Sequence, residues 1–579
     1  MRGELTSRAA GAGCVAIAAL GVAADLAKPP TADVGFFLYA AGRLLDGARL
    51  YRDVVDINPP LIFAANVPVV QLARATGLSE FLLYGLGSAL VVGLLLLYSS
   101  RLIVRYVLPG EPARARYLVL LLCFAFFAFP GFDFGEREHF VLALLVPYVM
   151  LAAAQWAGRE APAGDRVAAG LLSGAAIALK PSFVLVWLVL GGVRRMRGPR
   201  ASRWTPTPES AAGLGVLLVY GAAVLWLAPD YLKVVAVLGP AYAAWLREPF
   251  YKLLVLGPGI PLVAFALLAL GAMRRDVRAP ALAAALAWAM VACWAAGAVQ
   301  EKEFRYHFYP AMGFAFVLLG LLAAGAGTVG QGLAERIFRR TSRALLATIA
   351  VVVLASSARD AAGLNPVPRQ QAAEIDQMAA EVRKLADGRP VGVFSHTTGS
   401  AFPLANYADV ELASRFPSFW VIAALYWEAI ATGGPLRYRA VSQMAPAERY
   451  FLDAVRQDLT AAQPRLIVVL RPGRDAAVNG QRRLNFVAYF DRDPQLAALL
   501  ARYHFTARIG EYLFYERGEA GSVASGPLPS AVVGTLDVGR ARLADLRFGS
   551  LDGEWLFGVA LFVAAWVALA IGERRRPAL

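Results

Sequence analysis

Long apolar runs separated by short polar loops dominate the chain. Many of these runs are about 17–22 residues long, which is the length that a helix needs to cross a bilayer. They fall near residues 9–27, 61–76, 80–100, 117–131, 140–157, 167–193, 210–228, 251–273, 279–298, 308–328, 343–357 and 554–572. The pattern predicts a polytopic α-helical membrane protein.

The run 61–76 decides the predicted topology, because it is short and carries Asn66 and Pro68. If it lies on the outer surface instead of crossing, the arginine clusters between the spans all face the cytoplasm, as the positive-inside rule requires. The run 167–193 then counts as two short passes, broken at Lys180-Pro181. We therefore expect twelve transmembrane helices with both termini inside.

This topology places the acidic and mixed-charge loops on one side of the membrane, the outer side. The loops are 28–61, 131–139, the Lys180-Pro181 turn, 229–250, 300–307 and the long region 358–552. All six lysines of the chain also fall on this side, whereas the arginine clusters fall on the other. Topology explains the arginines but not these outer charges, so we expect the functional site among them.

The first outer loop, 28–61, predicts interfacial structure. Its first half reads as an amphipathic helix with Asp33 as a candidate N-cap and Gly47 as the end. The apolar face would consist of Phe36, Phe37, Ala40, Ala41, Leu44 and Leu45, with Arg43, Asp46 and Arg49 toward water. The second half ends in Asn58-Pro59-Pro60 and cannot be a regular helix, because paired prolines push the preceding residues to extended geometry.

Region 358–552 has mixed charge and no long apolar run, and it predicts a small α/β domain. Helices are expected at Glu374–Asp387 and Pro446–Ala462, and strands at Val391–Ser395, Leu466–Leu470 and Phe505–Tyr515. The predicted domains are thus a membrane module at 1–357, this domain at 358–552, and a final span with a basic tail at 553–579.

Composition excludes several other classes of protein. The chain has 579 residues, 58% of them hydrophobic, and a net charge of +15. Its arginines lie in short loops rather than on one soluble face, so we expect no nucleic-acid partner. The three cysteines lie in apolar runs, which argues against a disulfide framework or a thiol metal site. Residues 9–27 read as an uncleaved first span, although Val22-Ala23-Ala24 vaguely resembles a signal-peptide cleavage site.

The outer acids suit a reaction in which a hydroxyl or amine attacks a sugar carried on a lipid phosphate. Such a reaction needs a base, and Asp33 is the best candidate because it stands where the first span emerges. Its alternative role is that of a helix cap only. In the second outer loop, Glu138 or Glu136 could act as a second carboxylate beside His139, and a divalent cation shared with Asp33 is one possibility. The alternative is a solvated turn with a local pair between Glu and Arg137.

The outer cations suit the departing phosphate. Lys180 stands at the end of a short span, where a lysine needs an anionic partner, and snorkelling to the headgroups is the alternative. The 300–307 loop contributes Lys302, Arg305 and His307 as contacts to phosphate or sugar. For this loop the alternative is an anchor at the membrane interface.

In layout the chain resembles the GT-C class of membrane glycosyltransferases, especially bacterial relatives of protein O-mannosyltransferases and lipid A aminoarabinose transferases. The resemblance is carried by Asp33 after the first span, by a helix with Tyr39 and Gly47, by Asp56-Ile57-Asn58-Pro59-Pro60-Leu61, and by the motifs at 131–139 and 174–181. It implies Asp33 as the catalytic aspartate, Glu138 as the second acidic residue and Lys180 as the lysine that ends the fifth span. Asn58 departs from the class, which often has lysine there.

The resemblance also implies a polyprenyl-phosphate sugar donor and a reaction, usually inverting, on the periplasmic face. We predict a glycosyltransferase of the bacterial inner membrane, with 358–552 in the periplasm and an acceptor that is a glycan, lipid or protein. The expected substrate-binding residues are Asp56, Asn58, Tyr39, His139, Lys180, Lys302, Arg305 and His307. A transporter or flippase of a lipid-linked or charged solute is the main alternative, although the spans carry few central charges. A scaffold is a further one.

Overall fold

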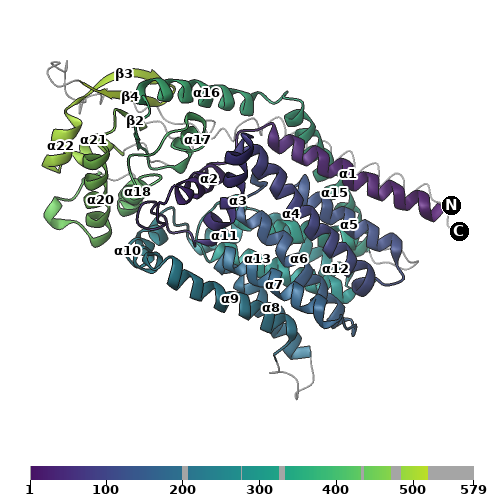
Figure 1. The fold of residues 1–579 in the computed structure, drawn as a ribbon. Coiled ribbons are helices and arrows are strands. Elements are labelled where there is room, and N and C mark those ends of the chain that lie inside the picture. Colours follow the sequence, from purple (N-terminus) through teal and green to yellow (C-terminus); the bar gives the residue numbers. More distant parts are fainter. Residues whose placement is uncertain are drawn as a thin grey trace.

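The computed structural model describes residues 2–197, 206–274, 277–324, 333–431, 436–470 and 484–518. Within them, a bundle of helices carries a small α/β unit at one end (Figure 1). The bundle contains α1 (Arg2–Leu26), α2 (Ala32–Leu45), α3 (Leu61–Thr76), α4 (Glu80–Leu102), α5 (Pro112–Phe127), α6 (Arg137–Trp156), α7 (Ala163–Leu179), α8 (Val184–Arg197), α9 (Pro208–Leu227), α10 (Asp230–Ala244), α11 (Phe250–Leu256), α12 (Ile260–Met273), α13 (Pro280–Ala298), α14 (Arg305–Ala323) and α15 (Leu333–Ala361).

Several of these helices are long and apolar enough to cross a membrane. Among the described residues seven pass this test, or eight if the pair α11 and α12, bent by 65°, forms one span. The helices α5, α7 and α8 have 16, 17 and 14 residues and are shorter. The expected break at Lys180-Pro181 is present, since α7 ends at Leu179 and α8 begins at Val184. The predicted span 554–572 lies outside the described residues, so the count of twelve stays a prediction.

The centre of the bundle is formed by α6, α13 and α14, which are apolar on all sides and mostly buried. Small residues let these helices approach their neighbours closely. A Cβ added at Gly313 would lie 2.5 Å from the side chain of Leu142, and one added at Gly320 would lie 2.3 Å from that of Leu121. This packing fixes the ends of α6 and α14, which carry residues of the site.

The predicted helix of the first outer loop is α2, and Gly47, with φ +89°, follows its end. Its apolar face does not lie against lipid, as an interfacial helix would, because Phe36 and Phe37 are buried within the protein. The ring of Phe36 packs 5.5 Å from Phe63 of α3 and 5.4 Å from Phe402 of the α/β unit. The α/β unit therefore sits directly on α2.

The α/β unit is built on a four-stranded sheet of order β1-β2-β4-β3. Its helices and strands are α16 (Pro366–Ala386), β1 (Val391–Phe394), α17 (Leu404–Ala408), α18 (Trp420–Leu425), α19 (Trp427–Ala431), α20 (Pro446–Ala462), β2 (Leu466–Leu470), α21 (Phe486–Phe490), α22 (Pro494–Leu500), β3 (Tyr503–Ile509) and β4 (Tyr512–Arg517). Strands β1 and β2 are parallel, with Val391 opposite Leu466, and β4 runs antiparallel to β2 and β3. The single strand predicted over 505–515 was wrong, because Gly510, with φ +54°, turns the chain there and makes a hairpin.

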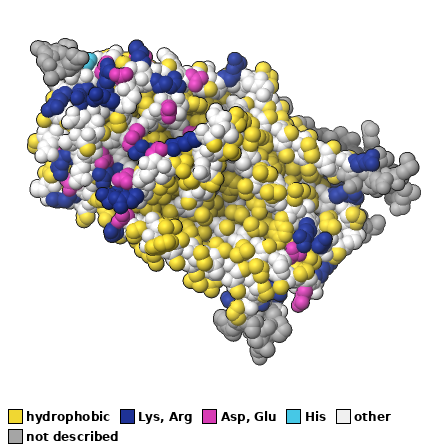
Figure 2. Space-filling view, in the orientation of Figure 1, with side chains coloured by type: hydrophobic (Ala, Val, Ile, Leu, Met, Phe, Trp, Pro, Cys, Tyr) yellow, Lys and Arg dark blue, Asp and Glu magenta, His cyan; other side chains and the backbone are white. Residues whose placement is uncertain are grey.

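Charged and hydrophobic side chains are distributed differently over the α/β unit and the helical bundle. Figure 2 shows that Lys, Arg, Asp and Glu side chains gather over the α/β unit, whereas the face over the helices is mainly hydrophobic. A smaller group of charged side chains lies at the end of the bundle away from the α/β unit. A bundle that crosses a membrane and carries the α/β unit in water would have this distribution.

Candidate active site

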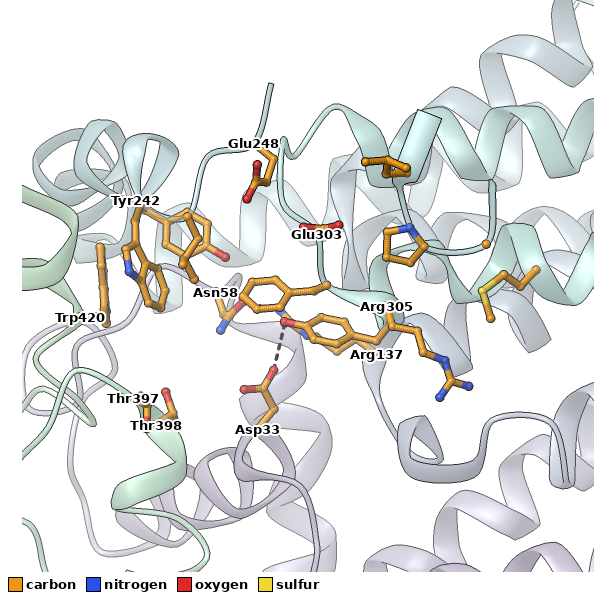
Figure 3. Close-up of a pocket in the computed structure, with 18 of the residues that line it drawn as sticks. Asp33, Asn58, Arg137, Tyr242, Glu248, Glu303, Arg305, Thr397, Thr398 and Trp420 are labelled. Carbon is orange, nitrogen blue, oxygen red and sulfur yellow. Dashed lines mark hydrogen bonds and ion pairs between the residues drawn. The ribbon is translucent and has the colours of Figure 1, made fainter. Parts of the chain in front are cut away.

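A cavity of about 1190 Å³ lies between the helical bundle and the α/β unit. Its polar lining consists of Asp33, Asp56, Asn58, Arg137, Glu248, Glu303, Arg305, Thr397 and Thr398. In Figure 3, Asp33 lies between Thr397 and Thr398 on one side and Arg305 on the other. Four residues predicted from the sequence, Asp33, Asp56, Asn58 and Arg305, thus line one cavity.

Asp33 stands in the first turn of α2, but it is not the N-cap. That position belongs to Thr31, whose hydroxyl accepts a hydrogen bond from the Val34 backbone N–H at 3.3 Å. The same hydroxyl donates to the carboxylate of Glu136 at 2.5 Å. The expected capping role of Asp33 is therefore wrong, and its carboxylate is left to face the cavity.

Arg137, the first residue of α6, connects the loop 28–61 with the loop 131–139. Its guanidinium lies 3.6 Å from the carboxylate of Asp33 and donates to the side-chain oxygen of Asn58. It also lies over the ring of Phe37, 5.2 Å from the centroid. The side chain is 7% exposed, so this cation is held in place beside the candidate base. The sequence analysis assigned Arg137 only to a local ion pair and missed this position.

The turn before the paired prolines holds Asp56 and Asn58 at the cavity. The Asn58 backbone N–H donates to the Asp56 carboxylate at 2.7 Å, and the Tyr51 hydroxyl donates to the Asn58 carbonyl at 2.6 Å. Burial raises the pKa of Asp56 to about 6, although the hydrogen bond from Asn58 and the charge of Arg137 oppose the rise. Burial also raises the pKa of Asp33, again against the Arg137 charge.

Glu138, Lys180 and His307 lie together behind the cavity and do not line it. The Lys180 ammonium forms an ion pair with the Glu138 carboxylate, which is fully buried. His307 Nε2 lies 3.8 Å from the same carboxylate oxygen. Glu138, the candidate second acid, and Lys180, the candidate phosphate-binding lysine, therefore form a buried ion pair in which each charge compensates the other.

Glu136 also lies outside the cavity lining. It is 4% exposed, and its second carboxylate oxygen has no hydrogen-bond partner in the described part of the chain. Burial raises its pKa well above the ordinary value, and the nearby Asp33 carboxylate adds to the rise. Glu136 and Asp33 are thus two close carboxyl groups joined through Thr31 and α2.

Three further residues predicted to bind substrate make structural contacts instead of lining the cavity. The Tyr39 hydroxyl accepts the Leu412 backbone N–H of the α/β unit at 2.9 Å. The buried ring of His139 hydrogen-bonds the Phe126 carbonyl at 2.7 Å and the Gly135 N–H at 3.1 Å. Lys302, 1% exposed, donates to the carbonyl oxygens of Tyr242, at 3.0 Å, and Trp245.

Other charged side chains form ion pairs at the edge of the cavity. Arg305 is half exposed and lies 3.5 Å from Asp133. Lys252 bridges the two lining acids, at 2.9 Å from Glu248 and 3.2 Å from Glu303. In the part of the chain that the structure describes, no group of three or more His, Cys, Asp or Glu side chains is placed to hold a metal ion.

The cavity has two further kinds of lining that the sequence analysis did not single out. An apolar end is formed by Leu256, Leu262, Met312, Leu345 and Ile349. Near Thr397 and Thr398 the lining is aromatic, with Tyr242, Trp245 and Trp420. The signal that could have located them is weak, because apolar and aromatic residues are abundant throughout this chain.

No family model matches the chain, and no curated protein matches it by sequence. Among solved structures, ArnT from Cupriavidus metallidurans bound to undecaprenyl phosphate is similar, with a TM-score of 0.52 and 16% identity over 90% of this chain and 99% of that one. The apo state of ArnT gives a TM-score of 0.53 and 15% identity over 89% and 98%. The chain therefore has the fold of a GT-C membrane glycosyltransferase, and the predicted resemblance is confirmed at the level of the fold.

Proposed function

We propose that the chain is a glycosyltransferase that moves a sugar from a polyprenyl-phosphate donor to an acceptor at the outer face of a bacterial inner membrane. The observation that carries the proposal is the position of Asp33. Its carboxylate lies beside the Arg137 guanidinium in a cavity that has an apolar end. A lipid-linked sugar phosphate needs these three features together.

The apolar end suits the first isoprene units of the donor, and the cations suit its phosphate. Arg137 and Arg305 both line the cavity, and guanidinium groups bind phosphate oxygens in a fork. The similar ArnT structure holds undecaprenyl phosphate. We assign the same class of lipid to this chain, with Arg137 in the role that the sequence analysis gave to Lys180.

The transfer step follows from these positions. An acceptor hydroxyl or amine attacks C1 of the donor sugar and forms the new bond, while the bond between C1 and the phosphate oxygen breaks. The electron pair of that bond stays on the phosphate, where Arg137 and Arg305 stabilise the added charge. The acceptor proton goes to the Asp33 carboxylate. Attack from the face opposite the phosphate inverts the configuration at C1.

The buried groups behind the cavity act through Arg137. Glu138 belongs to the same turn of α6 as Arg137 and pairs with Lys180. The Glu136 carboxylate accepts a hydrogen bond from the hydroxyl of Thr31, and Thr31 caps the helix that carries Asp33. We assign Glu138, Glu136, Lys180 and His307 as positioning residues rather than groups that touch substrate.

The outer face is proposed from the charge pattern. The arginine clusters in the loops away from the α/β unit fit the cytoplasm, which leaves the cavity and region 358–552 in the periplasm. Twelve spans with both termini inside fit this arrangement. The membrane module at 1–357 and the final span at 553–579 complete the proposed organisation.

The test compares envelope glycoconjugates by mass spectrometry in cells that lack the chain. The cells are complemented with the wild type, with Asp33→Asn, or with Asp230→Asn as a matched control. Asp230 forms an ion pair with Lys233 on the surface and does not line the cavity. We expect the wild type and the control to restore a sugar modification that Asp33→Asn does not restore. Identical glycoconjugates in all strains, or flipping of a labelled lipid without a covalent product, would contradict the proposal.

A further inference from the structure

A wall of aromatic rings and hydroxyl groups closes the cavity on the side of the α/β unit. Tyr242 belongs to α10 and Trp245 follows it, whereas Trp420, Thr397 and Thr398 come from the α/β unit. Figure 3 shows Tyr242, Trp420 and the two threonines on the same side of Asp33, away from Arg305. These five residues are called the aromatic–hydroxyl wall below. Both parts of the protein are needed to build it.

The rings of the wall are held in a fixed arrangement. Trp245 and Trp420 stack with centroids 5.8 Å apart at 28°, and Tyr242 meets Trp420 edge to face at 5.5 Å. Lys302 fastens this group, because its ammonium donates to the carbonyls of Tyr242 and Trp245 and lies 4.3 Å from the Tyr242 ring centroid. The buried indole N–H of Trp245 has no acceptor among the described residues. A rigid aromatic surface with a spare donor suits a ligand that is apolar on one face and polar at its edge.

The hydroxyl groups of the wall belong to a small network at the carboxyl end of β1. Thr397 Oγ1 lies 3.2 Å from Ser400 Oγ, and Thr398 Oγ1 lies 3.5 Å from Ser418 Oγ. Each hydroxyl can donate or accept by rotating, so the network can match a set of ligand hydroxyls. Ligands of α/β folds commonly bind at the carboxyl ends of strands.

The wall differs in charge from the opposite end of the cavity. The cations that line the cavity, Arg137 and Arg305, are not part of it, and the Lys302 ammonium behind it is engaged with carbonyl groups. Asp33 stands between the two ends. A neutral polyhydroxylated ring therefore fits the wall, whereas a phosphate fits the other end.

We infer that the aromatic–hydroxyl wall binds a pyranose ring of the acceptor, so that the acceptor is a saccharide or the sugar headgroup of a glycolipid. The inference rests on the proposed function, because it uses Asp33 as the base that receives the acceptor's proton. A pyranose stacks its C–H face on the ring of Trp245, which the buried ring of Trp420 supports, and directs its hydroxyls to Thr397 and Thr398. One of its hydroxyls then points toward Asp33.

The experiment measures binding of free saccharides to the purified full-length chain by titration calorimetry. The panel consists of neutral hexoses, N-acetylhexosamines and their disaccharides, with a pool of short peptides as the competing class. We expect millimolar binding of at least one saccharide, lowered at least about tenfold by Trp245→Ala and about threefold to tenfold by Thr398→Val. Trp226→Ala, which removes an indole that is 83% exposed on α9, should leave the affinity unchanged.

Two further arms separate the possible outcomes. Saturation with undecaprenyl phosphate should leave saccharide affinity within about twofold, since the two ligands take different ends of the cavity. Displacement by this lipid, equal losses in Trp226→Ala and Trp245→Ala, or binding of the peptides alone would overturn the inference. Saccharide binding by the wild type, without any sugar transferred from a polyprenyl-phosphate donor, would retain the site and reject the proposed function. Transfer of a sugar to a peptide, without saccharide binding, would retain the proposed function and reject the saccharide site.

Discussion

The carboxylate of Asp33 and the guanidinium of Arg137 lie 3.6 Å apart where the start of α2 meets the start of α6. The contact joins two loops that are separated by a complete passage of the chain through α3, α4 and α5. In the proposed mechanism this contact orients the base and holds a cation beside the departing phosphate.

Replacing Asp33 by Asn should abolish most of the transferase activity. The amide keeps the size of the side chain but cannot accept the acceptor's proton, and a general base contributes about 10²–10⁴ in rate. We expect kcat to fall by that factor while the melting temperature of the purified protein changes little. Asp230→Asn is the control, and full activity of the Asp33 variant would remove this carboxylate from the mechanism.

Replacing Arg137 by Lys should lower activity even though the charge is kept. A lysine ammonium cannot contact Asp33, Asn58 and a phosphate at once in the forked geometry of a guanidinium. We expect kcat to drop by about tenfold in Arg137→Lys and further in Arg137→Gln, in measurements at saturating donor. Arg305→Lys is the comparison, because Arg305 is half exposed and its guanidinium lies 3.5 Å from the Asp133 carboxylate. A larger loss at Arg305 than at Arg137 would reverse the assignment of the main phosphate contact.

Activity should depend on pH through the Asp33 carboxylate. Burial raises the pKa of Asp33 above the ordinary aspartate value of about 4. A base works only when deprotonated, so the rate should be low in acid, rise as the pH passes upward through the raised pKa, and then level off. The log of the initial rate against pH, at saturating substrates, locates this limb. An acid limb at about pH 4 would show that Asp33 is not the titrating base.

At Asp56, raising the pH should lower the stability of the fold, whereas at Asp33 it should raise the activity. Its folded pKa of about 6 lies above the unfolded value of about 4, so its protonated form is favoured by folding. The stability that this group contributes is fully present below about pH 4 and is lost as the pH rises through 6. We therefore expect Asp56→Asn to raise the melting temperature at pH 7.5 and to leave it unchanged at pH 4. Equal shifts at both pH values would assign the effect to packing instead.

The sequence predicted the parts of this protein that follow from local patterns. Apolar runs predicted the bundle, Gly47 marked the end of α2, and the break at Lys180-Pro181 follows from the ring of proline, which cannot continue a helix. The short apolar run of β2 and the pattern of α20 were equally local, and both boundaries match the structure. The sequence also predicted Asp33, Asp56 and Asn58, which line the cavity, because all three belong to the one continuous segment 28–61.

The rest depended on contacts between distant segments. Arg137 and Glu138 are neighbours in sequence, but a helix turns by about 100° per residue, so one lines the cavity and the other lies behind it. The burial of α2 against Phe402 could not be seen, since an amphipathic helix has the same pattern whether it faces lipid or protein. Trp420 enters the cavity from a part of the chain almost 400 residues from Asp33, and no local pattern marks it.

The buried pair Glu138 and Lys180 provides the last prediction. Each charge is compensated by the other in a site closed to solvent, so removing one partner leaves an unpaired buried charge, a change that costs about 3–5 kcal/mol. Glu138→Gln and Lys180→Met should each lower the melting temperature strongly. The double variant should recover most of that loss, since replacing both members of a buried pair is often nearly neutral.

The double variant also separates the two roles of Lys180. If the lysine only holds Glu138 behind Arg137, then the double variant should keep a substantial part of the wild-type kcat once it is folded, and its KM for the donor should be close to normal. If Lys180 binds the donor phosphate, stability should return while KM for the donor stays about tenfold or more above the wild type. Thermal unfolding and donor-dependent rates measured on the same preparations decide between them. Because Lys180 does not line the cavity, we expect the first result.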